Sequence, residues 1–251
     1  MKKRNTNIVA NLYKSLHNNT YEPSPHEVWA MALSAPCYRD PVASMGLVAG
    51  LSTFSFEKPK LYKILIKEFG SAGPQLIPHG RHTMLHEVSE DIFRNPSQAF
   101  FQHIRMRLIL LGSDAEGWIS KLVDDRLRKQ AMFIFNNLYL LPIAGIQAWN
   151  ISRAIYYDRC SLLFGLEGCN TAMGKIMRYA QLAQVLYGSW EDYFTSYAAG
   201  AQYMHPDVIM PEGLVDKLED LIGYICRQEH FGYELSWNLK LGHKLIKANK
   251  T

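Results

Sequence analysis

The sequence has few cysteines, and none of them forms the closely spaced pairs that are typical of disulfide frameworks or zinc sites. Its four cysteines, Cys37, Cys160, Cys169 and Cys226, are scattered. Such usage is typical of a reducing compartment, in which a buried thiol behaves as a small hydrophobic side chain. The basic residues 2–4 are not followed by an apolar segment, so no secretory signal is predicted. We therefore expect a soluble, cytoplasmic protein.

An apolar run long enough to cross a membrane is also missing. The most apolar window covers residues 131–149. Polar and helix-breaking residues, which are costly in lipid, interrupt this window. They are Asn136, Asn137, Pro142, Gly145 and Gln147. We expect no membrane span, and we interpret the window as a buried pair of helices.

Charge of one sign is not in large excess. The formal net charge is +4 at pH 7, and much of the lysine excess lies near the two ends. A basic terminus can contact nucleic acid, but the sequence shows no groove pattern of interleaved basic and aromatic residues. Nucleic-acid binding is therefore not expected.

Signatures of the common catalytic and cofactor sites are absent. The sequence contains no Gly-x-Ser-x-Gly motif, no phosphate-binding Gly-x-x-x-x-Gly-Lys loop and no Gly-x-Gly-x-x-Gly fingerprint. The acidic neighbours Glu191 and Asp192 point in different directions on a helix, so they do not predict an acid–base couple. We expect no cofactor and favour a protein without catalytic activity.

One polar cluster, around His82 and His86, has side chains that could form a metal-binding or catalytic site. If this segment is helical, the two histidines lie one turn apart, a separation at which both can hold one metal ion. The order differs from the metalloprotease His-Glu-x-x-His motif, and nothing identifies a third ligand. We therefore predict no metal site, with His82 and His86 as the alternative pair of ligands.

Apolar residues at helical spacing, by contrast, are abundant, whereas period-two alternation is scarce. We expect an all-α fold, a single irregular domain over residues 1–251 with roughly nine to eleven helices and little or no β-structure. The alternative to a single domain is an N-terminal lobe over residues 1–130 and a C-terminal lobe over residues 131–251, which carries the aromatic motif described below.

Local signals place several helix starts. Residues 24–27, Ser-Pro-His-Glu, have the pattern of a capping box with proline in the first turn. Pro96 begins a helix that is predicted to run to about Leu111. Ser113 and Glu116 are expected to cap the following helix, which carries the charged residues up to Lys129. Three further helices are predicted over residues 146–164, 171–187 and 190–204, with Ser189 as the cap of the last and Asp192 accepting from the Ser189 N–H.

The densest aromatic and small-residue pattern lies between residues 148 and 200. It reads Ala-Trp-Asn-x-x-Arg-Ala from Ala148, Tyr-x-Ser-Trp-Glu from Tyr187, and Tyr-x-x-Gly from Tyr197. This combination resembles the signature of a bacterial family known only as domain of unknown function 1266. The resemblance implies a helical, bacterial, intracellular protein, and no chemistry comes with it. Asn150 stands where the family usually has an aspartate.

The signature also predicts packing. We expect Trp190 to be largely buried and to hold its helix on the two preceding ones, with Arg153 at the same interface. An aspartate in place of Asn150 is expected to stabilise the fold slightly or leave it unchanged, provided that Arg153 lies within reach. Ala198, Ala199, Gly200 and Ala201 are small enough to let another helix approach closely.

From the compact helical pattern and the many aromatic residues we interpret the chain as a protein-binding module, either an immunity-type protein or an adaptor. The alternative is an enzyme with a polar pocket near residues 149–153 or near the two histidines. The partner's identity and the oligomeric state are not predicted. The candidate binding residues are those of the signature: Trp149, Asn150, Arg153, Tyr187, Trp190, Glu191 and Tyr197.

Overall fold

The computed structural model describes residues 24–38, 96–163, 168–206 and 235–241 of the chain. These residues are mainly helical and contain no β-strand, which confirms the all-α class for this part of the protein. The predicted total of helices includes segments outside the described residues. The α-helices are α2 (Pro25–Ala32), α6 (Pro96–Leu111), α7 (Ala115–Ser120), α8 (Asp125–Asn136), α9 (Gln147–Leu163), α10 (Cys169–Leu186) and α11 (Trp190–Met204).

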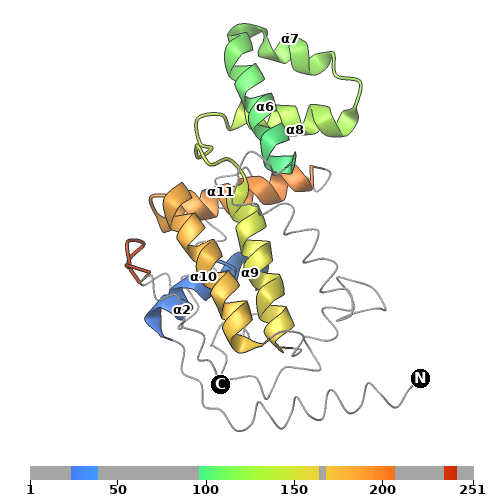
Figure 1. The fold of residues 1–251 in the computed structure, drawn as a ribbon. Coiled ribbons are helices and arrows are strands. Elements are labelled where there is room, and N and C mark those ends of the chain that lie inside the picture. The colour runs from blue at the N-terminus through green and yellow to red at the C-terminus, as the bar shows by residue number, and fades with distance from the viewer. Residues whose placement is uncertain (1–23, 39–95, 164–167, 207–234, 242–251) are drawn as a thin grey trace, which may run out of the picture.

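Helix α11 lies between two groups of helices (Figure 1). One group, α2, α9 and α10, buries an apolar cluster to which α11 contributes Tyr193, Phe194 and Tyr197. The other group, α6, α7 and α8, buries a second cluster to which α11 contributes Ala198 and Tyr203, among others. Because α11 has buried side chains on both sides, it connects the two clusters. None of the helices in the described part is both long and apolar enough to cross a membrane.

Several predicted helix starts are confirmed. The Ser24 hydroxyl accepts from the backbone N–H of Glu27, and the Glu27 carboxylate accepts from the Ser24 N–H at 2.8 Å, so both halves of the capping box are present. Helix α6 has the expected bounds and is followed by Gly112, whose φ of +53° suits glycine. The Ser189 side chain accepts from the backbone N–H of Asp192 at 3.1 Å and caps α11.

The prediction of a single helix from Ser113 to Lys129 is wrong. Ser113 lies in a 3-10 turn, η5 (Gly112–Asp114), and α7 begins after it without a side-chain cap. Helix α7 ends at Ser120, and Asp124 starts α8 by accepting from the backbone N–H of Leu127 at 2.8 Å. The sequence carries this signal, because aspartate is a preferred N-cap and Asp124 directly precedes α8.

The interpretation of residues 131–149 as a buried helix pair is also wrong. Helix α8 ends at Asn136 and α9 begins at Gln147, and the loop between them exposes apolar side chains. Tyr139 is 99% exposed and Ile143 is 92% exposed. Some of the apolar side chains in this window are therefore on the surface of the protein.

Helices α9 and α11 approach each other at Gly200. A methyl group added there would lie 2.4 Å from Cβ of Trp149 and 3.2 Å from the carbonyl oxygen of Ile146. The Ser196 hydroxyl, one turn earlier, donates to the Gly145 carbonyl at 2.6 Å and accepts from the Ala148 N–H at 3.2 Å. The prediction of a close approach through the small residues is confirmed, and the hydroxyl pairs backbone groups at the start of α9.

Buried hydroxyl groups also join α11 to α2. The fully buried Tyr193 hydroxyl lies 2.8 Å from the Ser152 hydroxyl and donates to the Leu33 carbonyl, which follows α2, at 3.2 Å. The Ser152 hydroxyl also donates to the Leu33 carbonyl, at 2.7 Å. Burial raises the pKa of Tyr193 well above its ordinary value, so the phenol stays protonated and remains a donor.

We predict that Gly200→Ala lowers the free energy of unfolding by about 1–3 kcal/mol, because the new methyl group forces α11 away from Trp149. The matched control is Gly174→Ala in α10, where an added methyl group meets no atom within 4 Å. That change should stabilise the protein by about 0.5–1 kcal/mol. Urea denaturation of both variants tests the prediction, and equal stability of the two would contradict it.

Candidate functional site

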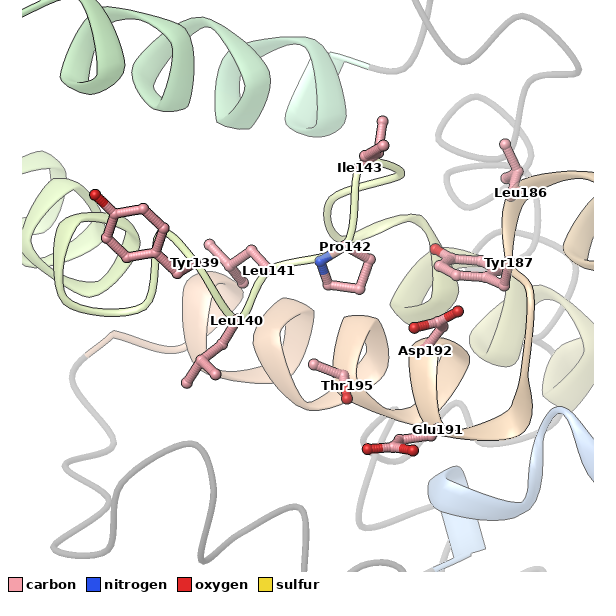
Figure 2. A pocket seen from close by; sticks show the side chains of 10 residues that line it. All are labelled: Tyr139, Leu140, Leu141, Pro142, Ile143, Leu186, Tyr187, Glu191, Asp192 and Thr195. Carbon is pink, nitrogen blue, oxygen red and sulfur yellow. The ribbon is translucent and has the colours of Figure 1, made fainter.

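A pocket of about 660 Å³ lies between the loop that precedes α9 and the first turns of α11. Figure 2 shows the loop side chains on one wall and the carboxyl groups of Glu191 and Asp192 on the other. Tyr187, at the end of α10, lines the same pocket. The complete lining is Tyr139, Leu140, Leu141, Pro142, Ile143, Leu186, Tyr187, Glu191, Asp192 and Thr195.

The loop wall is held in place by side chains of α6. The Arg105 guanidinium donates to the carbonyl oxygens of Leu141 and Pro142 at 2.8 and 2.6 Å. The amide groups of Gln102 and Gln98 donate to the next two carbonyl oxygens, those of residues 143 and 144, at 2.8 and 2.7 Å. Four consecutive carbonyl groups are thus fixed from one helix face, which restricts the loop to one path.

A glycine completes this arrangement. Gly145 has a φ of +64°, and a methyl group there would lie 2.8 Å from the Gln98 amide nitrogen and 2.9 Å from that of Gln102. Both the backbone conformation and the space therefore require glycine at this position. The Gln98 side-chain oxygen also accepts from the Ile146 N–H at 3.0 Å, so the hold on the loop continues to the start of α9.

Most of the apolar side chains of the loop are exposed to solvent. Tyr139 and Ile143 are almost fully exposed, and Leu140 is 51% exposed. Leu141 is the buried residue of the loop. The backbone that carries these exposed side chains is held by the hydrogen bonds from α6. The arrangement presents a preformed apolar surface.

The second wall carries negative charge. Glu191 and Asp192 are both exposed and occupy the first turn of α11, where the helix dipole favours carboxylates. Asp192 accepts from the backbone N–H of Gly188 at 3.2 Å. This differs from the sequence expectation, in which Asp192 accepts from Ser189. Glu191 lines the pocket.

Of the predicted site residues, only Tyr187 and Glu191 line the pocket. The Tyr187 hydroxyl is buried and lies 2.7 Å from the Ser196 hydroxyl. Burial raises the pKa of Tyr187 well above its ordinary value, so this phenol is a structural donor. Trp149 and Tyr197 are buried, with ring centroids 5.1 Å apart, and contribute to the packing of α9 on α11.

Arg153 and Asn150 have separate surroundings. Arg153 is partly exposed, donates to the Tyr157 hydroxyl at 2.7 Å and places its guanidinium carbon 5.2 Å from the Trp149 ring centroid. Asn150 is completely buried, and neither polar atom of its side chain has a hydrogen-bond partner within the described part of the chain. The expected proximity of an aspartate at position 150 to Arg153 is therefore not supported.

Trp190 also packs differently from the expectation. It is partly buried, and its ring centroid lies 4.9 Å from that of Trp29 and 4.9 Å from that of Trp237. It therefore holds α11 on α2 and on the segment 235–241 as well as beside Phe194. Trp29 and Trp237 lie far from the signature in sequence, which is why the signature alone did not indicate this contact.

The family comparison covers the pocket. A family model described as a protein of unknown function, DUF1266, matches residues 81–209. The chain belongs to the DUF1266 family. That range contains α6 to α11, with both pocket walls and the whole DUF1266 signature, and it excludes α2 and residues 235–241. No curated protein and no solved structure matches the chain.

His82 and His86 lie outside the described residues. Across residues 24–38, 96–163, 168–206 and 235–241, no three histidine, cysteine or acidic side chains gather in a way that could hold a metal ion. The sequence reasoning missed the pocket's loop wall. The available signal was the spacing of Gln98, Gln102 and Arg105, which places three long polar side chains on one face of α6.

We predict that Asn150→Asp lowers the free energy of unfolding by about 3–5 kcal/mol at neutral pH, because it buries a charge without a partner. Burial raises the folded-state pKa of the new carboxyl above its unfolded value of about 3.9, so the loss is absent below that pH and grows as the pH rises. Thermal melts between pH 4 and pH 8 test this.

The matched control for this prediction is Asn150→Leu, which has a similar size and no polar atom. It should melt within a few degrees of the wild type or above it, because it removes a buried amide that finds no partner among the described residues. An aspartate variant at least as stable as the wild type at pH 8 would show that a cation reaches position 150.

Proposed function

We propose that this protein is a protein-binding module, an adaptor or immunity-type protein of the cytoplasm, and that the pocket between loop 139–143 and α11 is its contact surface. The observation that carries the proposal is the pinned loop with outward apolar side chains. Three carbonyl groups of this loop and that of the next residue, Ala144, are fixed by α6, while Tyr139 and Ile143 remain almost fully exposed.

Preorganisation favours binding at such a surface. A loop that is already fixed loses little conformational entropy when a partner covers it, so more of the contact energy appears as affinity. Complete burial of an Ile or Leu side chain contributes about 1.5–3 kcal/mol. Tyrosine is a frequent anchor because its large ring has few rotatable bonds. Tyr139 and Ile143 are the anchors that the structure offers.

The charge of the second wall indicates the chemistry of the partner. Glu191 and Asp192 are exposed beside the apolar loop and have no described cation next to them. We infer a protein segment with apolar side chains that face the loop and a lysine or arginine that faces Glu191. The two carboxyl groups are neighbours at a helix start and point in different directions, so the pocket supports binding better than acid–base catalysis.

We predict that the double variant Tyr139→Ala, Ile143→Ala loses its partner while its melting temperature stays within a few degrees of the wild type, because both side chains lie in solvent. Loss of two anchors should weaken binding at least about tenfold. Quantitative affinity capture from the native cells compares this variant with the wild type. A photoreactive residue at position 139 reports direct contact.

The matched control is Val123→Ala, because Val123 is 97% exposed and does not line the pocket. It should capture the same protein as the wild type. Capture of identical proteins in identical amounts by the wild type and the double variant would overturn the proposal. The same conclusion would follow if the photoreactive residue formed no crosslink to the captured protein.

A further inference from the structure

A second surface binds a segment of the chain itself. Residues 235–241 lie against α2, α10 and α11, and side chains of these helices donate to the segment's backbone. The Trp190 indole N–H donates to the Leu235 carbonyl at 3.0 Å, and the Trp29 indole N–H donates to the Ser236 carbonyl at 3.1 Å. The Gln184 amide donates to the carbonyls of Trp237 and Leu239 at 2.6 and 2.9 Å.

One side chain of the segment is the anchor. Trp237 is 7% exposed, and its indole N–H donates to the Tyr187 carbonyl at 2.9 Å. Its ring centroid lies 5.0 Å from that of Trp29, in addition to the contact with Trp190. Large, buried aromatic rings whose polar atom finds a partner contribute strongly to recognition.

Burial alternates along the segment. Trp237 and Leu241 are buried, and Leu235 and Leu239 are partly buried. Ser236, Asn238 and Lys240 between them are exposed. The surface therefore contacts side chains in the pattern Leu-x-Trp-x-Leu-x-Leu, and the side chains between them face solvent. Of these, the Ser236 hydroxyl accepts from the Asn238 N–H at 3.3 Å within the segment.

Backbone contacts combined with sites for particular side chains are also found where proteins bind peptides. Contacts to the peptide backbone supply affinity regardless of sequence, and sites for alternate side chains supply selectivity. We define the docking surface as Trp29, Gln184, Tyr187 and Trp190. Its three side-chain donors and the Tyr187 carbonyl acceptor are available to any chain that carries the same pattern. Three of these four residues lie within the family match at 81–209, whereas residues 235–241 lie outside it.

We propose that the docking surface is a peptide-binding site for a tryptophan-centred Leu-x-Trp-x-Leu-x-Leu segment. Residues 235–241 occupy this site within the chain. A segment of the same pattern on another protein occupies it when the chain's own segment is displaced. An attached segment has an effective concentration in the millimolar range, so it protects the surface from weak competitors. Binding from another chain is thus strongest when the anchor at position 237 is missing.

The test uses full-length Trp237→Ala protein and a fluorescein-labelled peptide with the sequence of residues 235–241. Fluorescence anisotropy should show saturable binding that is at least about tenfold tighter than to the wild type, whose own segment competes. A peptide with alanine at the exposed positions 238 and 240 should bind equally well. A peptide with alanine in place of the tryptophan should bind at least about tenfold more weakly.

Absence of saturable binding to folded Trp237→Ala protein would overturn the proposal, as would equal binding of the peptide without tryptophan. If that variant does not fold, the wild type labelled with 5-fluorotryptophan replaces it. Excess unlabelled peptide should then shift the Trp237 fluorine resonance, assigned with Trp237→Phe, and an unshifted resonance at millimolar peptide would overturn the proposal. The Tyr139→Ala, Ile143→Ala variant should respond like the wild type, which separates this surface from the pocket.

Discussion

The contact between Gly200 of α11 and Trp149 of α9 is the constraint on which the described structure depends. It brings the two helices so close that position 200 has no room for a Cβ atom. At this separation the Ser196 hydroxyl can pair backbone groups on both sides of the α9 start, and the Tyr193 phenol can reach the end of α2. A wider spacing would leave these buried polar groups without partners, which is costly in an apolar interior.

The position of α11 also determines where the surfaces lie. Its two faces enter different apolar clusters, so the helix cannot rotate without loss of packing in one of them. Its first turn is therefore fixed relative to loop 139–143, which α6 holds from the other side (Figure 2). The pocket and the docking surface both result from this one placement, since Glu191 lines the first and Trp190 belongs to the second.

Most of the DUF1266 signature builds this framework. Trp149, Tyr187 and Tyr197 are buried, and burial keeps both phenols protonated. Glu191 is the exposed exception. Trp190 contributes both packing and a hydrogen bond, because its ring packs on other tryptophans while its N–H donates to a backbone carbonyl. Most of the signature residues thus pack helices together, whereas Glu191 and the exposed side chains of loop 139–143 lie outside this packing.

The sequence by itself determined the local features. The capping box at Ser24, the helix starts at Pro25 and Pro96, the Ser189 cap, and the close approach at Gly200 follow from propensities and spacing that act within a few residues. Only the tertiary structure decided that loop 139–143 is pinned and exposed, that Asn150 is buried away from Arg153, and that Trp29 and Trp237 meet Trp190. The physical reason is that burial and pairing depend on residues distant in the chain, and periodicity identifies an apolar face without identifying what covers it.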